Sequence, residues 1–160
     1  MIYLLDSNIF IQSKNTFFAF DICPGFWKWL STSDKIHSIS KVRDELLDGK
    51  DELAEWIKNG VNNSFFIEED EKIQLCYRDI AEYVYALPER FKPGVKAHFL
   101  SKADGWLIAA SKVLGATLVT HERYEPSCVK AIKIPNIARE FAVPYTDIFT
   151  VLRQFKVEFN

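Results

Sequence analysis

Two acidic side chains follow short apolar runs, at positions where a carboxylate could bind a ligand. The first run, Ile2–Leu5, ends directly at Asp6, and a second run, Ala116–Val119, is followed three residues later by Glu122. Unbroken apolar runs of this length are typical of strands buried on both faces of a parallel sheet. Ligands of such sheets bind outside the carboxyl ends of the strands, where both acids are expected. A turn-forming role is the alternative for Asp6, since aspartate side chains often bond to their own backbone.

Two further acids lie in segments with helical patterns. In the segment Ser40–Leu47 the apolar residues define an inward side, and Glu45 lies on its flank, whereas Asp44 points to the opposite side. An ion pair with a lysine or arginine would equally account for Glu45, because an unpaired buried charge is costly. Asp104 lies in the first turn of a helix expected over Ser101–Leu114, where the pattern S-x-x-D also matches a helix-capping box. Capping and ligand binding are compatible roles for this residue.

The four acids together indicate a divalent metal site. Carboxylates that gather without a cation repel one another and raise one another's pKa values. Ligand sets made only of oxygen suit Mg²⁺ or Mn²⁺. A hydrated divalent ion lowers the pKa of a bound water and neutralises charge on a phosphate, so the expected reaction class is phosphodiester hydrolysis. The candidate metal ligands and catalytic residues are Asp6, Glu45, Asp104 and Glu122.

Short apolar runs alternate with helical patterns along the chain, which predicts β-α units on a parallel sheet. The expected strands are Ile2–Leu5, Ile36–Ile39, Phe65–Ile67, Ala116–Val119 and Ala131–Ile134. The expected helices are Pro24–Leu30, Ser40–Leu47, Asp51–Asn59, Asp70–Leu87, Ser101–Leu114 and Thr146–Phe155. No internal repeat or linker divides the chain, so one domain is expected over residues 1–160.

The composition predicts a soluble cytoplasmic protein. Apolar residues make up 48% of the chain and charged residues 26%, and no apolar stretch approaches the roughly 18 residues of a membrane span. The three cysteines are widely spaced, which is typical of reduced cytosolic thiols. The net charge of −2 excludes a nucleic-acid binder that depends on a polybasic surface.

One stretch, residues 88–102, is locally basic. It holds a single acid, Glu89, among five basic side chains: Arg90, Lys92, Lys96, His98 and Lys102. A solvated loop with a short helix would account for this pattern, and so would a strip of residues that contacts phosphates.

Four motifs in order resemble the PIN domain, the metal-dependent ribonuclease fold found in many prokaryotic toxins of the VapC type. "YLLDSNIFI" resembles the opening strand of the family, and "KVRDELL" is similar to its second, helix-borne glutamate. "KADGWLIAAS" resembles the A-D-x-x-[IL]-A segment, which is the most specific motif of the set, and "LVTHERY" resembles the T-x-D motif. The similarity covers essentially the whole chain. Residues 20–30, "FDICPGFWKWL", resemble a feature of an uncharacterised PIN-like subfamily, where Trp27 and Trp29 are expected in the core or at an interface.

The resemblance implies a three-layer α/β/α sandwich around a mainly parallel sheet. It implies that the four acids hold one or two Mg²⁺ or Mn²⁺ ions, with support by hydrogen bonds from Ser7, Asn8 and Thr120. Residues expected near the metal rim as substrate contacts are Lys96, His98 and Lys102. The fourth acid is usually aspartate in the family, whereas Glu122 is one methylene longer. His121 beside it is either a phosphate contact or an exposed loop residue.

The predicted function is therefore that of a PIN-like endoribonuclease, the toxin of a toxin–antitoxin pair, with RNA as substrate. An antitoxin protein that inserts a segment into the acidic site, and a homodimer formed through apolar helix surface, are the expected partners. Two alternatives remain open from the residues. One is a non-catalytic PIN-like module that binds RNA or protein. The other is a haloacid-dehalogenase-like phosphotransferase, which needs a second aspartate where Asn8 stands.

Overall fold

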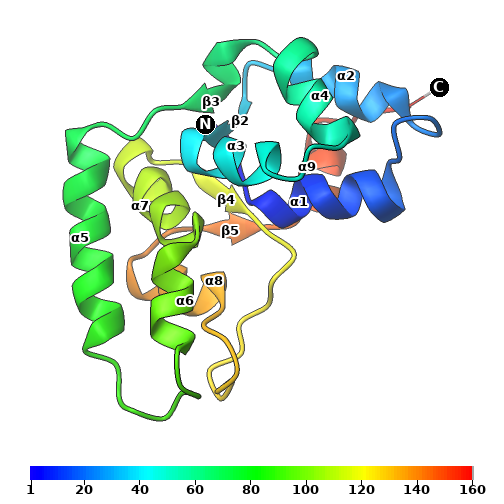
Figure 1. Cartoon of the computed structure of the whole chain (residues 1–160). Helices are drawn as coiled ribbons and strands as arrows, with labels where there is room; N and C mark the ends of the chain where they lie inside the picture. Colours follow the sequence, from blue (N-terminus) through cyan, green and yellow to red (C-terminus); the bar gives the residue numbers. More distant parts are fainter. Residues whose placement is uncertain (160) are drawn as a thin grey trace.

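The sheet at the centre of the protein has five strands, and all of them are parallel. The computed structural model describes residues 1–159. The strands are β1 (Tyr3–Leu5), β2 (Ile36–Ile39), β3 (Phe66–Ile67), β4 (Thr117–Val119) and β5 (Tyr145–Thr146). Their order across the sheet is β3-β2-β1-β4-β5 (Figure 1). This is the PIN-like α/β/α arrangement that the sequence predicts.

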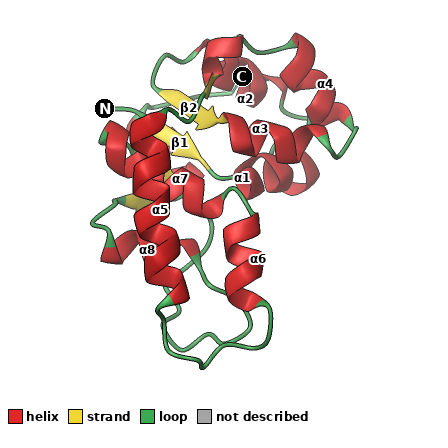
Figure 2. Ribbon diagram, turned by 60° about the vertical axis from the view of Figure 1, so that its left-hand side comes forward, coloured by secondary structure: helices red, strands yellow, loops and turns green. Residues whose placement is uncertain are grey.

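Helices cover both faces of this sheet (Figures 1 and 2). The chain adds β2 and then β3 on one side of β1, and after β3 it returns to add β4 and β5 on the other side. Because crossovers between parallel strands are right-handed, the helices that follow β3 lie on the second face of the sheet. The first face carries α1 (Ser7–Gln12) with its π-helical extension η1 (Ser13–Phe17), α2 (Pro24–Thr32), α3 (Ser40–Leu47), α4 (Glu52–Asn59) and α9 (Ile148–Gln154). The second face carries α5 (Glu71–Tyr85), α6 (Val95–Ser101), α7 (Asp104–Leu114) and α8 (Ile134–Glu140). A 3₁₀ turn, η2 (Asn63–Phe65), precedes β3.

The core lies on both sides of β1, as its unbroken apolar sequence predicts. Leu4 and Leu5 are completely buried between the two helical layers. The buried face of α7 is rich in alanine, including Ala109 and Ala110, which lets this helix approach both the sheet and α5 closely. Trp27 is also in the core, as expected. No helix among residues 1–159 is long and apolar enough to cross a membrane.

One expected strand is wrong. Ala131–Ile134 is not a strand, because Ile134 begins α8 and Pro135 lies in the first turn of that helix, a position that proline favours. The apolar residues at this place are buried in a loop and not in a β-strand. The fifth strand is Tyr145–Thr146, which pairs with β4. The other four expected strands are present, within one residue at either end.

The expected helix Ser101–Leu114 is also wrong in its first turn. Ser101 ends α6, and its hydroxyl donates to the carbonyl oxygen of His98 at 2.7 Å instead of capping α7. Lys102 has an extended backbone, and α7 begins at Asp104. The capping box read from the sequence is therefore absent, and another residue caps α7.

Candidate active site

The site lies at the topological switch point of the sheet. The chain leaves β1 toward β2 on one side, whereas β4 leads to β5 on the other, so a crevice opens between the carboxyl ends of β1 and β4. Asp6 follows β1 and Thr120 follows β4 directly. The two strand ends are joined, because the N–H of Asp6 donates to the carbonyl oxygen of Val119 at 3.0 Å.

Asp6 is buried at this point, with only 1% of its surface exposed. The Thr120 hydroxyl donates to its Oδ2 at 3.1 Å, and the Ser7 hydroxyl approaches Oδ1 at 3.4 Å. Asp6 occupies the N-cap position of α1, and although its side chain forms no capping hydrogen bond of normal geometry, the backbone N–H groups of Asn8 and Ser7 favour its ionised form. These local contacts only partly oppose the effect of burial, because the pKa of the carboxyl stays raised. Ser7 and Thr120 support Asp6 as predicted, whereas the Asn8 side chain is exposed and faces a cavity.

Glu45 projects inward from α3, as its helical phase predicts, while Asp44 is exposed. Its Oε1 accepts a hydrogen bond from the backbone N–H of Ala103 at 2.7 Å. Ala103 precedes the first residue of α7, so Glu45 caps the helix that Ser101 was expected to cap. The partner of Glu45 is thus a helix N-terminus, which attracts negative charge, rather than a lysine or arginine.

Asp104, the first residue of α7, shares the electrostatic environment of the other acids. The pKa of this carboxyl is raised from 3.8 to about 8, first by burial and then by the negative charges of Asp6, Glu122 and Glu45, against an opposing effect of Lys102. Asp6, Glu45 and Glu122 come from three other segments of the chain and are close enough to Asp104 to influence its ionisation. These four acids are called the acid cluster.

Glu122 completes the cluster from the segment after β4. Its Oε1 accepts a hydrogen bond from the N–H of Ile134, the first residue of α8, at 3.2 Å. Its own N–H donates to the Thr120 hydroxyl at 3.1 Å, and the same hydroxyl donates to Asp6. Burial raises the pKa of the Glu122 carboxyl, while the Ile134 hydrogen bond and the charge of Lys133 oppose the rise.

The pKa of Asp6 is raised from 3.8 to about 7 by burial and by the charge of Glu122, against the hydrogen bond from Thr120. Within residues 1–159, no three Asp, Glu, His or Cys side chains already stand in a metal-binding arrangement. Glu45 and Glu122 each give one oxygen to a helix amide instead. The donor chemistry nevertheless fits a hard divalent cation, because the cluster offers only carboxylate oxygens whose mutual repulsion such an ion would relieve.

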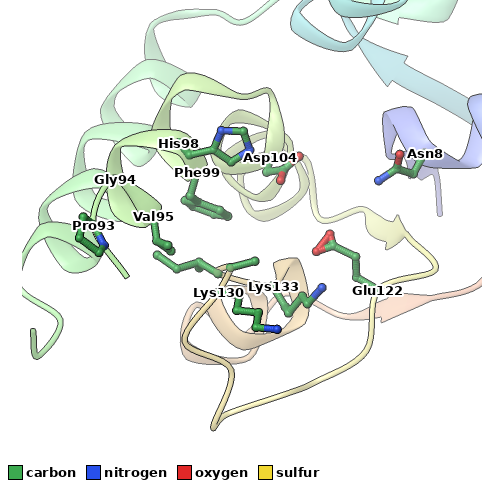
Figure 3. Close-up of a pocket in the computed structure, with 12 residues that line it drawn as sticks. Asn8, Pro93, Gly94, Val95, His98, Phe99, Asp104, Glu122, Lys130 and Lys133 are labelled. Carbon is green, nitrogen blue, oxygen red and sulfur yellow. The ribbon is translucent and has the colours of Figure 1, made fainter. Parts of the chain in front are cut away.

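A cavity of about 430 Å³ opens beside the cluster. Asp104 and Glu122 face it together with Asn8 (Figure 3). The basic residues that line it are His98, Lys130 and Lys133. His98 lies beside Asp104, and Lys133 lies next to Glu122 (Figure 3). The cavity is therefore lined by acids and bases side by side, a combination suited to a metal ion and the phosphate that it binds.

The predicted substrate contacts separate into two groups. His98 lines the cavity, and Lys102 is exposed close enough to Asp104 to influence its pKa. Lys96 is occupied elsewhere, because its ammonium donates to the carbonyl oxygens of Tyr85 and Leu87 at the end of α5.

His121 is not an exposed loop residue. It is half-buried, and its ring packs against Phe17 and Phe149 with centroid distances of 5.8 and 5.7 Å. Burial lowers the pKa of this imidazole. The sequence analysis missed Lys130 and Lys133: Lys130 precedes the residues that were expected to form a strand, and Lys133 lies among them.

The fold and this acidic crevice define the class: a PIN-like α/β protein with a carboxylate cluster at the switch point of its sheet. The chain belongs to the family described as a domain of unknown function, DUF4411, whose match spans residues 3–159. Among solved structures it is similar in fold to VapBC2 from Rickettsia felis, bound to a DNA fragment from their promoter. The TM-score is 0.56 at 17% identity, over 92% of this chain and 98% of that chain. No curated protein matches the chain.

Proposed function

We propose that this protein is a metal-dependent endoribonuclease of the PIN type. The observation that carries the proposal is the position of Asp6: a buried carboxylate at the switch point, close to the further acids Glu122 and Asp104. Buried like charges destabilise a fold unless they serve a ligand, so their concentration at the ligand-binding edge indicates function.

Each acid has a separate role in the proposed site. Asp6 and Asp104 are the principal ligands of Mg²⁺ or Mn²⁺, and Glu45 and Glu122 complete the set, each fixed by a helix N-terminus. Such an ion supplies activation of water and neutralisation of phosphate charge. Thr120 orients two elements of the site at once, since its hydroxyl donates to Asp6 and accepts from the N–H of Glu122.

The basic residues of the cavity support a nucleic-acid substrate. Lys130, Lys133 and His98 line the same cavity as Asp104 and Glu122, so a phosphate backbone lying in it would meet both kinds of side chain (Figure 3). With a net charge of −2, this contact is local, which favours a short single-stranded or looped RNA target over long duplex.

The structural similarity also supports an antitoxin partner. The structural neighbour is a VapBC2 assembly, and its fold covers almost the whole of this chain. We infer a toxin–antitoxin role in which a partner protein blocks the acidic crevice when the toxin is held inactive.

Cleavage assays with matched variants test the proposal. The protein is incubated with single-stranded RNA, structured RNA and DNA, in Mn²⁺, Mg²⁺ or chelator. We expect metal-dependent RNA cleavage that falls about 100-fold or more in Asp6→Asn and Asp104→Asn. Asp44→Asn is the control, since this acid lies on the same helix as Glu45 but is exposed. Cleavage that persists in chelator or in both active-site variants would overturn the metal nuclease, and RNA binding without turnover would favour the non-catalytic module.

A further inference from the structure

A second cavity, of about 460 Å³, lies between the end of β4 and the start of α9. Its volume is in the range of ordinary small-molecule sites, roughly 300–1,000 Å³. Glu122 lines this cavity as well as the first one. A ligand held here would therefore adjoin whatever the acid cluster holds.

Aromatic rings form one wall of the second cavity. His121 and Phe149 both line it, and their ring centroids are 5.7 Å apart. Phe17 flanks the two rings, at 5.1 Å from Phe149 and 5.8 Å from His121, and leaves 45% of its own surface exposed. The π-helical turn Ser13–Phe17 presents Phe17, and π-helical turns are frequent at functional sites.

The polar side of the cavity carries a cation. Arg123 lines it, is exposed, and takes part in none of the ion pairs found among residues 1–159. The two acids that line the cavity have other partners: Asp147 caps α9 by accepting from the N–H of Thr150 at 2.7 Å, and Glu122 accepts from the N–H of Ile134. Arg123 is the basic side chain that lines this cavity and is available to an anionic ligand.

We propose that this second cavity receives one unpaired base of the RNA, from the nucleotide next to the phosphate held at the acid cluster. The inference rests on the proposed ribonuclease function and identifies the place where one base of the substrate is recognised. The base stacks on Phe149 and His121, and Arg123 contacts the adjoining phosphate. A base inside a duplex is stacked on both faces and cannot enter, so the cavity selects single-stranded or looped RNA.

Binding of an eight-nucleotide single-stranded RNA tests the inference without requiring cleavage. The labelled RNA is titrated into the Asp104→Asn protein by fluorescence anisotropy, and an abasic nucleotide is then moved through each position. We expect one position at which loss of the base weakens binding about 10-fold, the usual effect of removing one stacked base. The Asp104→Asn protein that also carries Phe149→Leu should bind the intact RNA as weakly as its parent binds the abasic RNA. Moving the abasic nucleotide should no longer change the affinity of this double variant.

Phe155→Leu is the matched control, because Phe155 follows the other end of α9 and should leave the abasic response intact. The inference is overturned if no position matters, if Phe149→Leu responds like its parent, or if Phe149→Leu weakens only the binding of a protein partner. Cleavage by the wild-type protein in Mn²⁺ is measured separately. If cleavage occurs without any abasic response, the base cavity is refuted and the nuclease stands; an abasic response without cleavage refutes the nuclease alone.

Discussion

Replacing Asp6 by asparagine should stabilise the metal-free protein at pH 8. Asp6 is buried and its pKa is raised from 3.8 to about 7. Between these values the folded state keeps a proton that the unfolded chain has released, so unfolding releases protons and stability falls as pH rises. The loss begins above the unfolded value near pH 4 and is complete above pH 7. Asparagine carries no charge at any of these pH values and avoids the loss.

The size of the gain follows from the same pKa. A tenfold change in proton affinity corresponds to about 1.4 kcal/mol, so ionising Asp6 in the folded protein costs at most about 4 kcal/mol. Repulsion by Glu122 contributes part of this cost, and small movements of that side chain relieve it. Asparagine also keeps an acceptor for the Thr120 hydroxyl. We therefore expect a gain of about 2 kcal/mol at pH 8, or a rise in Tm of roughly 4–8 °C for a chain of this length.

Thermal unfolding in chelator at pH 4, 5, 6, 7 and 8 measures the effect. The difference between Asp6→Asn and wild type should be smallest at pH 4 and grow steadily toward pH 8. Asp44→Asn, which replaces an exposed acid, should show no such trend. Mn²⁺ at pH 8 should raise the Tm of the wild type and not that of Asp6→Asn, because only a bound ligand adds stability. A variant that is less stable than wild type at pH 8 in chelator would refute the reasoning.

Substitutions at three other residues give further predictions. Glu45→Gln should keep the cap on the Ala103 N–H and the stability of the wild type in urea while losing cleavage, whereas Glu45→Ala should also lose about 1 kcal/mol of unfolding free energy. Lys133→Gln should weaken RNA binding and reduce the slope of log affinity against log salt concentration by about 1, without changing the thermal stability in chelator. Gly105→Ala should destabilise the protein by about 1–3 kcal/mol in urea, because the added methyl would lie 3.0 Å from a ring carbon of Tyr77.

The positions of Asp6 and Glu45 could be predicted from the sequence, because local patterns determine the direction in which each side chain points. The apolar run before Asp6 places it at a strand end, and helical phase turns Glu45 inward and Asp44 outward, as the structure has them. Both inferences need only the period of an element and the position where it stops. The partner of Glu45 was not predictable in the same way, since the N–H of Ala103 is 58 residues away in the chain.

The positions of Lys130 and Lys133 depend on how a loop closes. The Asn136 side chain accepts from the N–H of Glu125 and donates to the carbonyl oxygen of the same residue, each at 2.8 Å. This pairing closes the segment after Glu122, in which both lysines line the first cavity. No periodicity marks such a contact, and the apolar residues Ala131, Ile132 and Ile134 resemble a short strand.

The glutamate at the fourth acidic position has a structural reason in this chain. Glu122 lies on the loop after β4 and must reach both the cluster and the first amide of α8, where its Oε1 accepts from Ile134. Glu45 does the same from α3, with one oxygen on the Ala103 N–H at the start of α7. Each glutamate thus binds a helix N-terminus with one oxygen. Glu122 also lines the cavity beside Asp104. The longer side chain of glutamate gives it the reach from the loop after β4 to the first amide of α8, and the cleavage assays proposed above test whether the site is active.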